Sequence, residues 1–196
     1  MKAEKQAGMI VLFLFVLLAI FLIIVFFKTK APGYDYNGFD VQEIDLGNTT
    51  VYRTTMYINN AAEPRFLNSR YGPREIESFE ADEFRKDILD KKKLYATVDP
   101  DQNLTGKTMI ALFEINNLIE LFYGIGVDGA LTHNANNYTE KSCTDVNSEE
   151  GVIWLKLDNE NKITNENGCI IIKGVTEEDL IKGADRLIFG LLKVIK

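Results

Sequence analysis

The chain has 196 residues, a formal net charge of −7 and a hydrophobic fraction of 46%. Four of the five charged residues among the first thirty are lysines, so the negative charge belongs to residues 31–196. Such an acidic region repels phosphate backbones, which argues against nucleic-acid binding. Its length is sufficient for one domain with a hydrophobic core of its own.

An uninterrupted apolar run begins at Met9 and ends at Phe27. As a helix these nineteen residues would be about 28 Å long, close to the thickness of the hydrocarbon core of a bilayer. The run ends without the small-residue pattern of a signal-peptidase site. We therefore expect an uncut signal anchor at 9–27 that binds the lipid bilayer, after a short cytoplasmic tail at 1–8.

The orientation of this anchor is not decided by its flanking charges, because positive residues mark the cytoplasmic side and the two sides are balanced. Lysines flank the run in equal number, Lys2 and Lys5 before it and Lys28 and Lys30 after it. An extracytoplasmic domain is instead favoured by Cys143 and Cys169, and more weakly by N-x-S/T sequons. The sequons begin at Asn48, Asn103 and Asn137.

Pro32 and Gly33 interrupt any continuation of the anchor helix, so residues 28–38 are expected to form a linker before a domain at 39–196. The domain begins with a predicted β-hairpin, because β-rich runs flank Gly47-Asn48. Residues 64–67 predict a third short strand, and the apolar spacing within 80–93 predicts a short amphipathic helix.

The middle of the domain alternates between predicted strands and helices. We expect a strand at 94–98, a helix at about 106–123 and a strand at 127–131. The apolar side of that helix is predicted to contain Ile110, Phe113, Leu118 and Leu121. The unbroken apolar runs 152–155 and 169–172 predict strands covered on both faces, joined by a polar loop at 158–168.

The last element is a predicted helix that begins at Thr176, where Thr176 and Asp179 match a capping box. Apolar residues then recur at helical spacing and predict packing on a sheet. They are Leu180, Ala184, Leu187, Leu191 and Ile195. The fold class is therefore mixed α/β (α+β): one domain of two or three layers, with an N-terminal hairpin and a C-terminal amphipathic helix.

Cys143 and Cys169 are the two cysteines of the chain. In an oxidising compartment they predict an intradomain disulfide, which would be worth about 3–4 kcal/mol in the chain-entropy model. The alternative is two buried free thiols that behave as small hydrophobic side chains. Two thiols are too few for a structural zinc site.

Two short motifs resemble known ligand sites but lack essential residues. Gly106-Lys107-Thr108 precedes a helix as in a P-loop, yet Asp101 stands where the first glycine is needed. Thr105 is better interpreted as a helix cap, and no nucleotide is predicted. Asp99, Asp101 and Asn103 resemble the start of an EF-hand, but Leu104 and Ile110 replace its glycine and glutamate. A solvated turn is favoured over a looser calcium site.

His133, the single histidine, lies in a polar stretch that contains none of the usual companions of a catalytic base. A surface or capping role is therefore favoured. No catalytic residue, cofactor or metal ligand is predicted from the sequence.

Arginines are concentrated in one segment, where Arg65, Arg70 and Arg74 surround Tyr71-Gly72-Pro73. Arginine binds carboxylate or phosphate through two parallel hydrogen bonds, so a site for an anionic ligand or partner is one interpretation. An acidic run at 75–83 follows directly, and internal ion pairing is the favoured alternative.

The chain also resembles a group of uncharacterised archaeal membrane-anchored proteins of the cell surface. The resemblance rests on RYGPREIE at 70–77, the two cysteines, CIIIKG at 169–174 and EDLIKGADRL at 178–187. It implies a cell-surface domain of unassigned function in which Cys143 and Cys169 form a pair, and it implies no active site.

The leading hypothesis is a non-enzymatic, membrane-tethered cell-envelope protein that binds a protein partner or contributes to an assembly. A membrane-anchored enzyme, or a module that binds an anionic ligand through the arginine segment, is the alternative. A pilin-like subunit is a further alternative. Pilin helices continue into the domain, whereas Pro32-Gly33 interrupts this one, and a glutamate near the start of the apolar run is lacking.

Overall fold

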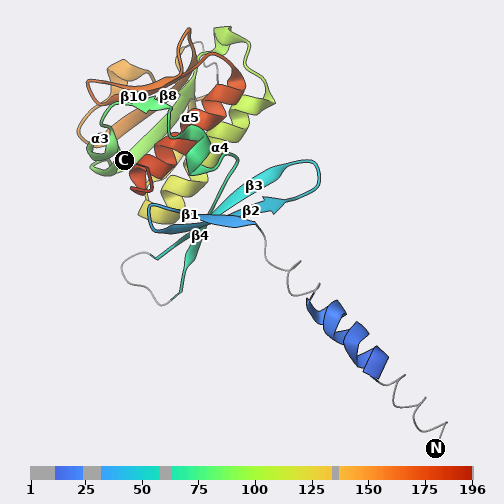
Figure 1. Ribbon diagram of the computed structural model, residues 1–196. Helices are drawn as coiled ribbons and strands as arrows, with labels where there is room; N and C mark the ends of the chain where they lie inside the picture. The colour runs from blue at the N-terminus through green and yellow to red at the C-terminus, as the bar shows by residue number, and fades with distance from the viewer. Residues whose placement is uncertain (1–11, 24–31, 58–62, 134–136, 196) are drawn as a thin grey trace, which may run out of the picture.

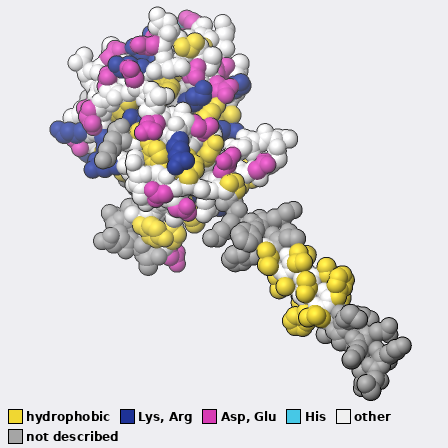
Figure 2. All heavy atoms as spheres, viewed as in Figure 1, with side chains coloured by type: hydrophobic (Ala, Val, Ile, Leu, Met, Phe, Trp, Pro, Cys, Tyr) yellow, Lys and Arg dark blue, Asp and Glu magenta, His cyan; other side chains and the backbone are white. Residues whose placement is uncertain are grey.

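The computed structural model describes residues 12–23, 32–57, 63–133 and 137–195 (Figure 1). Residues 12–23 form a helix in which every residue is exposed, and Figure 2 shows hydrophobic side chains along it. Among the described residues, no helix is both long and apolar enough to cross a membrane. The predicted span 9–27 extends past this helix at both ends, into residues 9–11 and 24–27, which lie outside the described residues.

A four-stranded antiparallel sheet, here the small sheet, begins the domain. Its strands lie in sequence order: β1 (Gly33–Tyr36), β2 (Phe39–Asp45), β3 (Thr50–Met56) and β4 (Arg65–Ser69). The predicted hairpin is confirmed, with Ile44 opposite Val51, and the third strand is β4. Residues 33–36 were expected to belong to the linker. They form strand β1, which pairs with β2 across a turn at Asn37 and Gly38, both with positive φ.

The second sheet, here the large sheet, has the order β5-β9-β10-β8-β6-β7. Its strands are β5 (Glu80–Ala81), β6 (Lys93–Val98), β7 (Gly126–Leu131), β8 (Glu150–Leu157), β9 (Lys162–Glu166) and β10 (Cys169–Gly174). Strands β10, β8, β6 and β7 are mutually parallel. The prediction of a loop at 158–168 was wrong, because β9 runs antiparallel to β10 within it.

The helices of the domain are α2 (Pro73–Ile76), α3 (Arg85–Leu89), α4 (Gly106–Tyr123) and α5 (Glu177–Leu191), with 3₁₀ turns η1 (Pro100–Gln102) and η2 (Cys143–Asp145). The predicted bounds of α4 are confirmed, and Thr105 caps it by accepting from the Lys107 N–H. The capping box of Thr176 and Asp179 at α5 is also confirmed. The helix predicted at 80–93 is reduced to α3, because its first residues form β5 beside β9.

Helices α4 and α5 pack against each other and lie between the two sheets (Figure 1). They cover one face of the large sheet, where Ile153 and Leu155 of β8 point into the main core. The small sheet packs on the far side of the helix layer, where its Val41 and Leu67 belong to the same core as Leu187 of α5. The Asn37 side chain, in the turn between β1 and β2, also donates to the carbonyl of Val194, just after α5. The molecule is therefore a mixed α/β domain with helices between two sheets.

The opposite face of the large sheet has a smaller apolar cluster. Val152 and Trp154 of β8 lie there beside Ile171 of β10. Cys143 and Val146, from the segment between β7 and β8, pack over them. This cover explains why β8 and β10 are apolar on both faces, as the sequence predicts.

The predicted apolar side of α4 was partly wrong. Leu118 is buried, but Phe113 and Leu121 are 66% and 48% exposed. The helix buries small and β-branched residues instead: Thr108, Ala111, Ile115 and Ile119. A helix that packs closely against both a second helix and a sheet needs short side chains at its contact face, and this shifts the buried face away from the largest residues.

Candidate functional site

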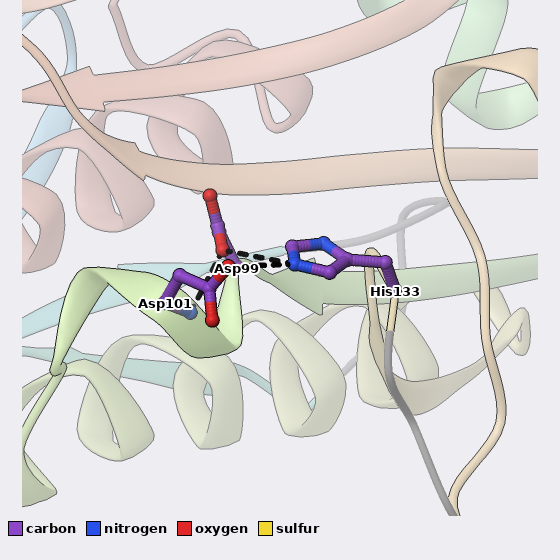
Figure 3. A group of neighbouring side chains, drawn as sticks. All are labelled: Asp99, Asp101 and His133. Atoms are coloured by element: carbon purple, nitrogen blue, oxygen red, sulfur yellow. Dashed lines mark hydrogen bonds and ion pairs between the residues drawn. The ribbon is translucent and has the colours of Figure 1, made fainter.

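A carboxylate and histidine cluster lies at one edge of the large sheet, where two adjacent parallel strands end (Figure 3). Val98 at the end of β6 lies opposite Leu131 at the end of β7. Asp99 follows Val98 directly, and His133 follows Leu131 after one residue. Because the two strands are parallel neighbours, Asp99 and His133 are brought together. This is the edge at which α/β sheets commonly bind ligands.

The cluster contains three possible ligand atoms, all within 4.8 Å of one another. His133 Nε2 lies 3.0 Å from Asp101 Oδ2 and 4.0 Å from Asp99 Oδ1. The side chains of His133, Asp99 and Asp101 are 40%, 24% and 76% exposed, so the cluster is open to solvent. One imidazole nitrogen and two carboxylates form a donor set that suits a divalent transition metal.

Local hydrogen bonds orient the side chains of the cluster. The Thr132 hydroxyl lies 2.9 Å from His133 Nδ1, which directs Nε2 toward the aspartates. The Asp101 N–H donates to Asp99 Oδ1 at 2.9 Å, so Asp99 caps the η1 turn. This is the Asx-type turn that the sequence predicts, and Asn103 ends it with a positive φ of 49°.

The charge state of His133 depends on its neighbours. Its hydrogen bond to Asp101 raises the pKa of the imidazole above 6.5, and the negative charges of Asp101, Asp99 and Glu140 add to the shift. Metal binding requires the neutral imidazole. A metal must therefore compete with a proton that Asp101 stabilises.

The neighbouring part of this edge is partly closed by Gln102. Its side-chain amide donates to the Leu157 carbonyl and its carbonyl oxygen accepts from the Leu157 N–H, at 3.0 and 2.9 Å. This pair of bonds fixes the η1 turn against the end of β8. A pocket of about 520 Å³ lies beside the turn, lined by Asp99, Asn103, Thr105 and Met109 among others.

The three candidate arginines are placed against three different partners. Arg65 Nη1 donates to the Leu121 carbonyl at the end of α4, at 2.5 Å. Arg70 Nε lies 3.5 Å from Glu114 Oε1 of α4. The guanidinium of Arg74 lies 3.9 Å from the centre of the Tyr34 ring.

The three arginines therefore do not share one pocket. Arg70 alone of the three lines a pocket of about 420 Å³ between the small sheet and the helix layer, together with Tyr52 and Lys107. Its ion-pair partner Glu114 is remote in sequence from the acidic run at 75–83, where the sequence placed the pairing.

The N-terminus of α4, which resembled a P-loop, is occupied by a carboxylate of the protein itself. Glu177 of α5 accepts from the backbone N–H groups of Thr105 and Thr108, at 2.9 and 3.1 Å. It also accepts from both threonine hydroxyls, at 2.8 and 2.7 Å. This carboxylate fills the position that a phosphate would need.

Cys143 and Cys169 form a disulfide. It joins η2 to the first residue of β10 and thereby attaches the segment between β7 and β8 to the large sheet. Cys169 is fully buried. The predicted intradomain pairing is confirmed, and the alternative of two free thiols is not.

From the sequence, the pair Asp99 and Asp101 and the single His133 were separate features. Nothing local joins them, because even Asp101 and His133 are 32 residues apart. The usable signal was the position of two of them, since Asp99 follows one predicted strand immediately and His133 follows another after one residue. Recognising the cluster required knowing that β6 and β7 are parallel neighbours.

Comparisons with models of protein families, with curated proteins and with solved structures find no match to this chain. The resemblance to archaeal cell-surface proteins therefore remains a prediction.

Proposed function

We propose that this chain is a membrane-tethered binding module whose domain lies outside the cytoplasm. The observation that carries the proposal is the disulfide between Cys143 and Cys169, because such bonds persist in oxidising compartments and are rare in the cytosol. The apolar run at 9–27 supports the tether, since it is long enough to span a bilayer.

The topology can be tested in cells that express the full chain. Mobility on non-reducing and reducing gels, after alkylation of free thiols, reports the disulfide. Protease is added to intact cells whose cell wall or outer membrane has been removed. Cleavage then reports on which side of the membrane residues 32–196 lie. We expect an oxidised, protease-accessible domain in the membrane fraction. Free thiols together with protection from protease would refute the extracytoplasmic placement.

The binding activity that the geometry supports best is that of a divalent transition-metal site at Asp99, Asp101 and His133. Its support is the convergence of three ligand atoms from two strand ends, with His133 and Asp99 already oriented by hydrogen bonds. Three protein ligands leave a further coordination position for water or a partner's side chain. We take Zn²⁺ as the probe because imidazole and carboxylate both bind it.

Isothermal titration of the metal-free full chain with Zn²⁺ tests this site. We expect one bound ion, with affinity reduced about tenfold or more in Asp101→Asn and in His133→Gln. Affinity should also fall as the pH is lowered, because the raised pKa of His133 favours its protonated form. Asp158→Asn is the matched control, since Asp158 lies at the same sheet edge but pairs with Lys156.

Unchanged affinity in both cluster variants would refute the metal site. Equal loss in the Asp158→Asn control would do the same, because it would indicate only diffuse attraction of a cation to an acidic surface.

A second candidate activity is the binding of an anionic ligand near Arg70. The observation in its favour is the 420 Å³ pocket in which Arg70 and Lys107 lie beside Tyr52 and Tyr71. Thermal-shift assays with phosphate and citrate should show stabilisation that Arg70→Ala removes. Arg65→Ala and Arg74→Ala should retain it, because neither residue lines this pocket. A shift that survives Arg70→Ala excludes this pocket.

A further inference from the structure

One buried and one largely buried carboxylate lie between the small sheet and the helix layer. Asp185 of α5 is 1% exposed, and the side chain of Glu114 on α4 is 15% exposed. Neither belongs to the metal cluster. Buried carboxylates are rare unless they are paired, so their contacts need an explanation.

Both carboxylates contact the segment that follows β4. The backbone N–H groups of Arg70 and Tyr71 donate to Asp185 Oδ2, at 3.1 and 2.8 Å. The Arg70 guanidinium approaches Glu114 Oε1, with 3.5 Å between Nε and the oxygen. Residues 70 and 71 are thus attached to both α4 and α5, and through β4 they attach the small sheet to the helix layer.

The second oxygen of each carboxylate lacks such contacts. Asp185 Oδ1 and Glu114 Oε2 are buried, and neither has a hydrogen-bond partner within the part of the chain that the structure describes. The guanidinium of Arg70 thus contacts Glu114 alone of the two, while Asp185 accepts only from backbone N–H groups of the same segment. A buried charge without compensation is unfavourable, whereas a proton on one carboxyl removes the excess charge and supplies a donor.

Other charged groups near the pair are engaged elsewhere. The Tyr71 hydroxyl donates to Glu178 on the solvent side of α5. Further charged groups lie on elements that pack around the pair: Arg74 donates to the Asp35 carbonyl, Glu75 accepts from the Gly72 N–H, and Lys182 pairs with Asp179. Arg70 is thus the main compensating charge for the pair.

We propose that Glu114 and Asp185 hold one proton between them and act as a pH-sensitive latch, which fastens the small sheet to the helix layer when it is protonated. When the proton is lost, repulsion between two buried carboxylates weakens the attachment of residues 70 and 71. The latch would control access to the pocket that Arg70 lines, because that pocket lies at the same junction.

The pKa shifts agree with this geometry. Burial raises the pKa of Glu114 from 4.5 to about 7, although the Arg70 charge opposes the rise. Burial also raises the pKa of Asp185, and the neighbouring Glu114 charge adds to the shift. The folded protein thus retains a proton that the unfolded chain has released, so stability falls as pH rises from about 4.5 through about 7.

Hydrogen exchange of the full chain in a neutral detergent tests the latch. Protection factors for the peptide that contains residues 65–72, corrected for intrinsic exchange rates, are compared at pH 6 and pH 8. We expect about a tenfold loss of protection at pH 8 in the wild type and little change in Glu114→Gln, whose side chain is uncharged at both values. Over the same range the melting temperature of the wild type should fall by about 5 °C more than that of Glu114→Gln.

His133→Gln is the control, because the pKa of His133 is also raised, by its hydrogen bond to Asp101, but this residue lies outside the junction. This variant should show the same loss of hydrogen-exchange protection at residues 65–72 between pH 6 and pH 8 as the wild type. The infrared carbonyl band of a protonated carboxylic acid, present at pH 6 and lost by pH 8, needs no variant. A wild type without this band, or the same loss of protection in Glu114→Gln, would overturn the proposal.

Discussion

At the scale of single residues, Glu177 connects the two main helices. It belongs to the first turn of α5, yet its carboxylate accepts four hydrogen bonds from Thr105 and Thr108 at the start of α4. An acidic group at a helix N-terminus satisfies unpaired N–H groups and interacts favourably with the helix dipole. Thr105 alone caps α4 more weakly, through one contact of 3.4 Å.

Replacement of Glu177 by alanine should lower the free energy of unfolding by about 1–2 kcal/mol, because two backbone donors of α4 lose their partner. Burial acts to raise the pKa of Glu177, but the hydrogen bonds from Thr108 and Thr105 outweigh burial and leave this pKa lowered. The contribution of Glu177 to stability is therefore complete above pH 4.5 and is lost as the pH falls below that value. Urea unfolding at pH 7 measures the change. Glu120→Ala, an exposed site on α4, should stay within about 0.5 kcal/mol.

At the scale of elements, the contact between α5 and β10 depends on a glycine in the middle of the helix. A Cβ atom at Gly183 would lie 2.3 Å from Ile172 Cγ2 and 3.2 Å from Phe79 Cζ. Helix propensity favours alanine over glycine by about 1 kcal/mol, so the preference of the isolated helix and the needs of the packed helix are opposed here. Close packing is the stronger requirement at this position.

Gly183→Ala should therefore destabilise the protein by about 1–3 kcal/mol, despite the gain in helix propensity. Gly106→Ala is the matched comparison, since Gly106 begins α4 and a Cβ there would meet no atom within 4 Å. That change should be neutral or slightly stabilising. Chemical denaturation of both variants gives the two values, and a Gly183→Ala protein as stable as the wild type would contradict the assigned packing.

The sequence predicted those elements whose local signals agree. For α4 and α5, the capping residues and the apolar spacing indicate the same helix, and the predicted first residues of both helices were correct. Strand β9 was missed because Ile163 is its one apolar residue among polar neighbours, and its pairing with β10 depends on a turn at Asn167 and Gly168, both with positive φ. Edge-like polar strands have weak local patterns and form through long-range pairing.

The candidate site was predictable to a smaller degree. Asp99 and Asp101 were correctly assigned to a turn, but their approach to His133 depends on the order of β6 and β7 in the sheet. The three arginines were grouped because they are close in sequence, and the fold separates them onto different partners. Strand order and side-chain direction are tertiary properties that spacing along one chain does not determine.

At the scale of the whole molecule, one apolar core connects both sheets with the helix layer. Val41 and Leu67 of the small sheet belong to the same buried cluster as Ile153 and Ile170 of the large sheet. A shared core favours cooperative unfolding, because neither sheet can lose its contacts with the helices without exposing apolar surface of the other layers.

Thermal unfolding at pH 6 should therefore occur in one transition. Trp154, the single tryptophan, reports on the large sheet by fluorescence, while far-ultraviolet circular dichroism reports on all elements. We expect the two probes to give the same midpoint. A second transition seen by circular dichroism alone would indicate that the small sheet unfolds separately.

The disulfide also has a consequence for how the protein must be produced. The segment with Cys143 covers Val152, Trp154 and Ile171, so a chain that stays reduced can release this cover and expose adjacent apolar strands. Exposed strands of this kind promote aggregation. Recombinant material made in a reducing cytosol should therefore collect in inclusion bodies, whereas export to an oxidising periplasm should give soluble domain.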